Sequence, residues 1–138
     1  MQFKVKPYGK EYRFDQESDI TEVFYTYSGL RIVVVAATSM FSNILLEIYF
    51  SNTRGFRFLD EGDLIAYWET KAFNTNHHVY EILSGGWSNG EKLQEDILDV
   101  SIGFEVNEWF IATTNCCMNV LSGTEPRIAE IMEGVRKI

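Results

Sequence analysis

The stretch from residue 31 to residue 68 constrains the fold most, because apolar runs of strand length alternate in it with polar turns. Residues 31–37 are apolar on both faces, as expected of a central strand. In residues 43–52 apolar side chains recur at every second position, the period of a strand with one buried face. A turn at 52–55 leads to a third short strand at 56–59. Consecutive strands with short links predict an antiparallel meander.

Directly after these strands the periodicity changes to that of a helix. Residues 64–68 place large apolar side chains at helical spacing. Asp63 precedes them and can accept the free N–H groups of a first helical turn. The carboxylates of residues 60–63 lack the longer, alternating spacing of a calcium loop. We therefore interpret this acidic segment as a turn and helix cap, with Asp63 as the cap, and not as a metal site.

The remaining elements predict a chain that is mostly strand. Residues 8–22 are polar and acidic and are expected to form a surface loop. Thr124 and Pro126 resemble a helix start, so a C-terminal helix is expected after them. Further strands are expected at 2–7, 23–27, 77–83, 98–104, 109–113 and 118–122, the last two forming a hairpin. The predicted fold class is mainly β with minor α: a curved antiparallel sheet or a β-sandwich with about two short helices, in a single domain over 1–138.

The charge of the chain limits its partners. The formal net charge is -8 and the pI is about 4.7. Binding to nucleic acid depends on clustered Lys and Arg that neutralise phosphates. The nearest cluster, Lys4 to Arg13, is followed at once by Asp15, Glu17, Asp19 and Glu22. We therefore expect no nucleic acid among the ligands, and any charged partner is expected to be basic.

The location expected from the sequence is the cytoplasm. The first residues have no apolar core of signal-peptide length. The longest apolar run, 32–37, is far too short to span a membrane. The two cysteines are neighbours, Cys116 and Cys117, and adjacent cysteines rarely form a disulfide because the ring is strained. Free thiols suit a reducing compartment.

Metal binding and catalysis find little support in the pattern of residue types. His77–His78 and Cys116–Cys117 are adjacent pairs, and neighbours on a strand point to opposite faces. We therefore expect one buried and one exposed member in each pair, and neither a metal site nor a cofactor. A Cys–His nucleophile pair would lack the helix N-terminus that usually stabilises a thiolate. The chain is expected not to be an enzyme, although carboxylates gathered by the fold stay open as an alternative.

Two neighbouring segments are the candidates for a binding surface. Residues 84–90, SGGWSNG, form a glycine-rich loop around Trp87, a residue type common at interface hot spots. Residues 91–108 carry a run of carboxylates against Lys92 alone. Such a run either faces water or steers a cationic partner. The candidate partner-binding residues are Trp87, Glu91, Glu95, Asp96, Asp99, Glu105, Glu108 and Trp109, with the two tryptophans as exposed anchors.

Two stretches, GFRFLDEGDLIAYW and WFIATTNCCMNVLSGTEPRI, resemble segments of small acidic immunity proteins from bacterial toxin–immunity systems. The resemblance covers about a third of the chain and implies no particular site residue. It implies a non-enzymatic protein that inhibits a basic partner, such as a toxin, by docking an acidic surface on it. The alternative is a small-molecule-binding domain with a cavity in a curved, aromatic-rich sheet, because ten phenylalanines and seven tyrosines could form its walls.

Overall fold

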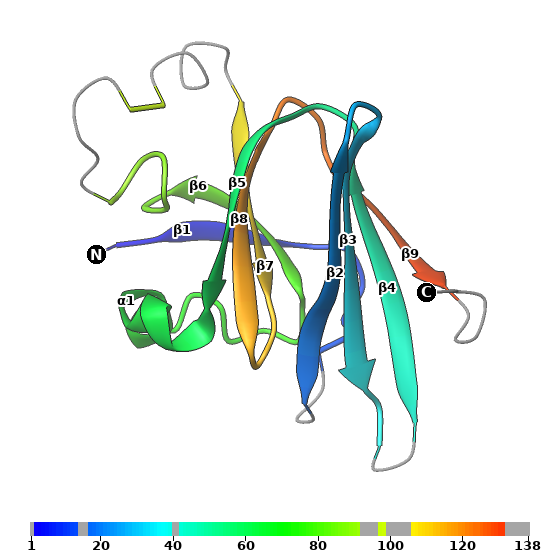
Figure 1. The fold of residues 1–138 in the computed structure, drawn as a ribbon. Helices are drawn as coiled ribbons and strands as arrows, with labels where there is room; N and C mark the ends of the chain where they lie inside the picture. The colour runs from blue at the N-terminus through cyan, green and yellow to red at the C-terminus, as the bar shows by residue number, and fades with distance from the viewer. Residues whose placement is uncertain (1, 14–16, 40–41, 92–96, 99–105, 132–138) are drawn as a thin grey trace.

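The computed structural model describes residues 2–13, 17–39, 42–91, 97–98 and 106–131. These residues are mostly in strands and form two antiparallel sheets with one short α-helix (Figure 1). Sheet A holds, in spatial order, β1 (Lys4–Tyr8), β6 (Val79–Ser84), β7 (Asn107–Ala112), β8 (Cys116–Ser122) and β5 (Thr53–Asp60). Sheet B holds β2 (Ser18–Thr26), β3 (Gly29–Ala37), β4 (Asn43–Phe50) and β9 (Arg127–Ile131).

Strand β3 is the central strand that its composition predicts. It pairs with β2 on one side and β4 on the other, and most of its side chains are buried. The β2–β3 hairpin is closed by the pair Thr26 and Gly29. Gly29 has a φ of +132°, and a Cβ there would lie 2.5 Å from the carbonyl oxygen of Phe50. Only glycine fits this turn without displacing β4.

The predicted three-strand meander is wrong at its third member. β3 and β4 pair as expected, but β5 crosses to sheet A and pairs with β8. The place beside β4 is taken by β9, where Ile48 faces Ile128. The C-terminal helix predicted from residue 124 is therefore wrong over 127–131, because pairing with the open edge of β4 outweighs the weak helical spacing of a short segment.

The predicted surface loop at 8–22 is also too long. β2 begins at Ser18 and so includes the last five residues of that segment. Ile20 points into the core and is 6% exposed, while polar neighbours on the strand conceal the alternation in the sequence. A bulge between Ile20 and Glu22 further disturbs the two-residue period. The expected strand at 98–104 lies almost wholly outside the described residues.

The two sheets enclose one apolar core, and sheet A covers a second. The first core joins Ile32, Ile48 and Phe50 of sheet B to Trp109 and Met118 of sheet A. The second lies on the other face of sheet A, where the 3₁₀ turn η1 (Glu61–Leu64), helix α1 (Ile65–Glu69) and the segment after them lie over β6, β7 and β8. The centre of sheet A is thus buried on both faces, which explains the long apolar runs in its strands.

The helix predicted at 64–68 is confirmed, but its cap is not the predicted one. Asp60, not Asp63, accepts a hydrogen bond from the N–H of Gly62, at 2.7 Å, and starts the 3₁₀ turn. The indole N–H of Trp68 donates to the carbonyl of Glu61, at 2.7 Å, and ties α1 back onto that turn. The acidic segment 60–63 therefore forms a turn, as predicted, but its side-chain cap is Asp60 and starts η1 rather than α1.

Candidate functional site

Three of the predicted binding residues meet on the face of sheet A that carries α1, beginning with the buried carboxylate Glu108. This side chain is 4% exposed. It accepts hydrogen bonds from the backbone N–H groups of Trp87 and Ser88, each at 2.8 Å, and from the Ser88 hydroxyl, at 2.6 Å. Asn119 Nδ2 donates to it as well, at 2.9 Å. Four donors thus compensate for the removal of this carboxylate from water.

The second predicted carboxylate, Glu91, belongs to the same network. The Arg57 guanidinium donates to both carboxylate oxygens of Glu91. The Nε of Arg57 donates to Asn119 Oδ1 at 2.8 Å. The Tyr67 hydroxyl donates to Glu91 at 2.7 Å and accepts from Asn119 at 3.1 Å. Burial alone would raise the pKa of Glu91, but the hydrogen bonds from Arg57 and Tyr67 outweigh it and hold this pKa below its usual value. The Arg57 guanidinium also lies 5.2 Å from the Trp87 ring centroid.

This network fastens the glycine-rich loop to the sheet. The carboxylates of Glu91 and Glu108 are saturated by internal donors, and Trp87 is half-buried against Arg57. An incoming cation would have to break several charge-assisted hydrogen bonds to reach either carboxylate. The network is thus a positioning device for residues 84–91, and the docking role predicted for these three residues does not fit their contacts.

The other predicted residues divide into one inside the core and four outside the described residues. Trp109 is 1% exposed and packs against Tyr8 and Phe50 at ring-centroid distances of 5.0 and 6.3 Å. The expectation of an exposed anchor at Trp109 is therefore wrong, because its place on β7 points it between the sheets. The four residues outside the described part are Glu95, Asp96, Asp99 and Glu105.

The cysteines and histidines occupy separate, mostly buried positions. His78 is buried and His77 is half-exposed, as predicted, but both Cys116 and Cys117 are buried. Burial raises the pKa of Cys116 to about 11 and that of Cys117 to about 12, so both are protonated thiols near neutral pH. Within the described residues no group of three or more His, Cys, Asp or Glu is placed to hold a metal ion.

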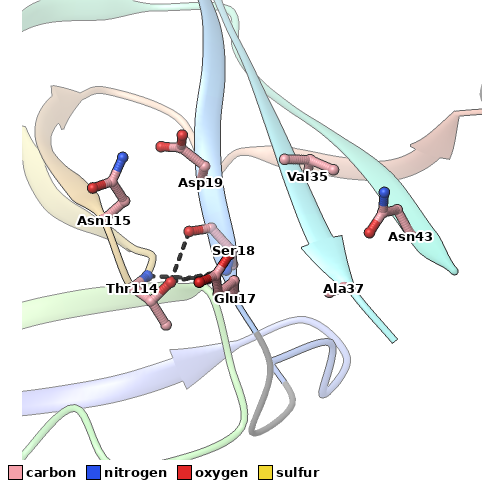
Figure 2. Close-up of a pocket in the computed structure, with 8 residues that line it drawn as sticks. All are labelled: Glu17, Ser18, Asp19, Val35, Ala37, Asn43, Thr114 and Asn115. Carbon is pink, nitrogen blue, oxygen red and sulfur yellow. Dashed lines mark hydrogen bonds between the residues drawn. The ribbon is translucent and has the colours of Figure 1, made fainter. Parts of the chain in front are cut away.

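A different acidic site lies where the start of β2 meets the β7–β8 turn (Figure 2). It is an open pocket of about 550 Å³. Two carboxylates and two side-chain amides supply acceptors, and two small apolar residues form one wall. The lining residues are Glu17, Ser18, Asp19, Val35, Ala37, Asn43, Thr114 and Asn115, with no Lys, Arg or His among them.

Reciprocal hydrogen bonds between the two sheets build this pocket. Thr114 Oγ1 accepts from the N–H of Ser18 at 2.9 Å and donates to the Ser18 carbonyl at 2.8 Å. The N–H of Thr114 donates to Ser18 Oγ at 3.1 Å. Figure 2 shows the two residues joined by these hydrogen bonds, with Glu17 and Asp19 on either side of Ser18 in the chain. Since β2 and the β7–β8 turn are locked together, the carboxylates on either side of Ser18 are held on a fixed rim.

The orientation of Asp19 is set by a thiol. Cys116 Sγ donates to Asp19 Oδ1 at 3.1 Å. The ion pairs Arg31–Glu47 and Arg57–Glu91 of the described structure involve neither Glu17 nor Asp19. The pocket therefore offers negative charge and amide oxygens beside the apolar wall of Val35. This is the chemistry that receives a lysine or arginine side chain, whose methylenes pack while the charged end pairs.

A second open groove of about 730 Å³ lies at the opposite edge of sheet B from β2, between residues 8–12 and β9. Three tyrosines line it, and their hydroxyls are engaged: Tyr8 donates to Glu125, Tyr12 to Glu130 and Tyr49 to the Ser28 carbonyl. The first core packs between the two sheets. Both openings thus lie outside the core, unlike the interior cavity of the small-molecule alternative.

Sequence reasoning did not place Glu17 and Asp19 in a site. The signal was present, since the acidic run from Asp15 to Glu22 directly follows the basic cluster. Because the run was predicted to be a loop, its strand period was missed. In a strand, residues two apart such as Glu17 and Asp19 lie on the same face. The role of Thr114 and Asn115 arises only from the meeting of two sheets, which local sequence does not encode.

Comparisons with protein-family models, with curated proteins and with solved structures found no match. Across the described segments, none of the helical structure has the length and apolar character required to span a membrane.

Proposed function

We propose that the protein is a non-enzymatic binding protein that docks an acidic surface on a basic partner protein. The observation that carries this proposal is the pocket around Glu17 and Asp19, which holds two carboxylates and no cation among its lining residues. A lysine or arginine of the partner would enter it, with Asn43 and Asn115 as further acceptors. We propose this pocket as the docking site in place of Glu91 and Glu108, because the carboxylates of those two residues already accept hydrogen bonds from the internal network.

The net charge of -8 supports the same partner class. A strongly acidic protein attracts a cationic one over about 10 Å at moderate salt, which raises the rate of encounter. Within this class we favour an immunity-like inhibitor of a basic toxin, acting in the bacterial cytoplasm. We also infer that the two packed sheets form a β-sandwich, whose rim at the β7–β8 turn presents the pocket.

Affinity capture from extract of the source cells tests the proposal. The wild-type protein is compared with the double variant Glu17→Gln/Asp19→Asn and with Glu69→Gln, which removes an exposed charge on α1. We expect wild type and Glu69→Gln to retain a protein of high pI at low salt, and the double variant to lose it. Retention of an acidic or neutral protein, or equal retention by all three, would contradict the proposal.

The alternative, a small-molecule binder, is supported by the tyrosine-lined groove beside β9. The aromatic faces of Tyr8, Tyr12 and Tyr49 and a volume of about 730 Å³ suit a ligand of drug-like size. A fragment screen observed by NMR distinguishes the two functions. Saturable shifts at these tyrosines with an unchanged Glu17–Asp19 pocket would favour the small-molecule function over protein docking.

A further inference from the structure

Strand β2 is an edge strand of sheet B and is longer than the other three edge strands in the described structure. Its first residues are already covered by sheet A. Thr114 takes the N–H and C=O of Ser18, and the Cys116 thiol approaches the Ile20 carbonyl at 3.9 Å. From residue 21 to residue 26 no described strand pairs with its outer side. This segment is a template for one more strand.

The hairpin geometry identifies the backbone groups at this edge. Thr26 and Gly29 close a two-residue turn, so they are the hydrogen-bonded pair of the hairpin. Residues facing each other in an antiparallel ladder alternate between bonded and non-bonded pairs. Val23 and Tyr25 then direct their N–H and C=O groups away from β3, toward the open side. These are the groups that an added strand would bond.

Exposed aromatic side chains lie beside this edge. Phe24 is 46% exposed, Tyr25 is 61% exposed, and Tyr27 at the turn is fully exposed. Phe58 lies on β5, one of the two edge strands of sheet A, and is 51% exposed. Tyr25 contacts Phe56 of β5 at a ring-centroid distance of 5.7 Å, so the two edges are adjacent. Aromatic rings next to unpaired backbone are the composition of strand-addition interfaces.

The charge of β2 indicates which kind of strand its outer edge would bind. The first residues of β2 and the residue before them carry Glu17 and Asp19, and residues 17–26 hold no lysine or arginine. A second copy of β2 would bring a second Glu17 and a second Asp19 to the same edge, which disfavours pairing between copies. An extended segment with lysine or arginine at alternate positions would instead meet these acids with opposite charge.

We propose that the outer edge of β2, at residues 21–26, receives an extended, basic segment of the partner protein as an added antiparallel or parallel strand. The inference rests on the proposed function and specifies how the basic partner binds. Backbone bonds to Val23 and Tyr25 supply affinity that is independent of the partner's sequence. The carboxylates of Glu17 and Asp19 and the aromatic rings at 24–27 select its side chains.

The test uses short capped peptides and amide exchange measured by NMR. The probe alternates valine and lysine; one control replaces lysine by glutamate, and a second keeps the lysines but is N-methylated along the edge that faces β2. At low salt, the probe is expected to slow exchange at the Val23 and Tyr25 amides about tenfold, while both controls leave it unchanged. Val23→Pro, which removes an edge donor, is expected to abolish the effect while the rest of the spectrum stays folded.

The other outcomes separate this inference from the proposed function. Probe binding that shifts Asp19 and Asn115 but leaves exchange at Val23 and Tyr25 unchanged would overturn strand addition and leave the acidic docking site standing. Equal binding of the N-methylated control would overturn it too. Dimers that protect Val23 without any peptide would show that a second copy occupies the edge. No binding of either lysine peptide would overturn the basic occupant, while affinity capture decides the proposed function independently.

Discussion

Asp19 on β2 accepts a hydrogen bond from the thiol of Cys116 on β8, with 3.1 Å between Oδ1 and Sγ. The contact crosses from sheet B to sheet A and lies beside the reciprocal bonds of Ser18 and Thr114. It holds one carboxylate of the acidic pocket in place with a neutral donor, so the negative charge of Asp19 is not cancelled. The pocket can therefore be rigid and acidic at once.

The first prediction concerns the two thiols. Because their pKa values are raised to about 11 and about 12 and both side chains are buried, neither Cys116 nor Cys117 forms a thiolate readily. We expect alkylation at about pH 8 to be slow in the native protein and to become rapid in denaturant. Mass spectrometry with iodoacetamide measures this. Labelling of Cys116 at the rate of a free model thiol would contradict the raised pKa.

The second prediction concerns the carboxylate that holds the glycine-rich loop. Glu108→Gln replaces an acceptor oxygen with an NH₂ group opposite the donors of Trp87 and Ser88. We expect the free energy of unfolding to fall by about 3 kcal/mol, as for the loss of several charge-assisted hydrogen bonds. Urea denaturation measures it. Ser88→Ala, which removes one of the donors, is the control and should cost about 1 kcal/mol; equal effects would be evidence against the network.

The third prediction concerns stability in mild acid. His78 is buried, and its Nδ1 donates to the Ala112 carbonyl at 2.7 Å. Burial lowers the pKa of His78 below 6.5. As pH falls, the unfolded chain therefore binds a proton at this histidine before the folded chain does. The contribution of neutral His78 to the stability of the fold is complete above pH 6.5 and is lost as the pH falls toward the lowered pKa of the folded state.

Thermal unfolding between about pH 7 and about pH 5 tests the His78 contribution. Wild type should lose stability more steeply over this range than His78→Gln, even if the variant is less stable at neutral pH. His77→Gln is the matched control, because His77 is half-exposed. Parallel pH profiles for wild type and His78→Gln would exclude His78 as the titrating group.

Sequence patterns predicted the elements better than their arrangement. The continuous apolar run of β3, the alternation in β4, the helix after Asp63 and the β7–β8 hairpin are local signals and were found. The crossing of β5 to sheet A was not predicted, because the pairing of β5 with β8 joins residues more than fifty positions apart in the sequence. The helix prediction for residues 127–131 failed for the same reason. These residues form a strand because they pair with the open edge of β4, which is far away in the sequence.

The candidate site shows the same division. The acidic composition and the preference for a basic partner are properties of the whole chain that its sequence displays. Which carboxylates are available depends on contacts that only the fold creates. Glu108 follows an acidic run and appears exposed in the sequence, yet four donors surround it. Glu17 and Asp19 resemble loop residues, yet they flank a pocket.

Association kinetics with the captured basic partner test the central claim most directly. Stopped-flow rates are compared for wild type, Glu17→Gln/Asp19→Asn and the control Glu69→Gln, at low and at high salt. We predict that the double variant associates about three- to tenfold more slowly than wild type at low salt, that the difference shrinks as salt screens the charges, and that Glu69→Gln behaves as wild type. An association rate that is the same for all three proteins at low salt would contradict docking through the acidic pocket.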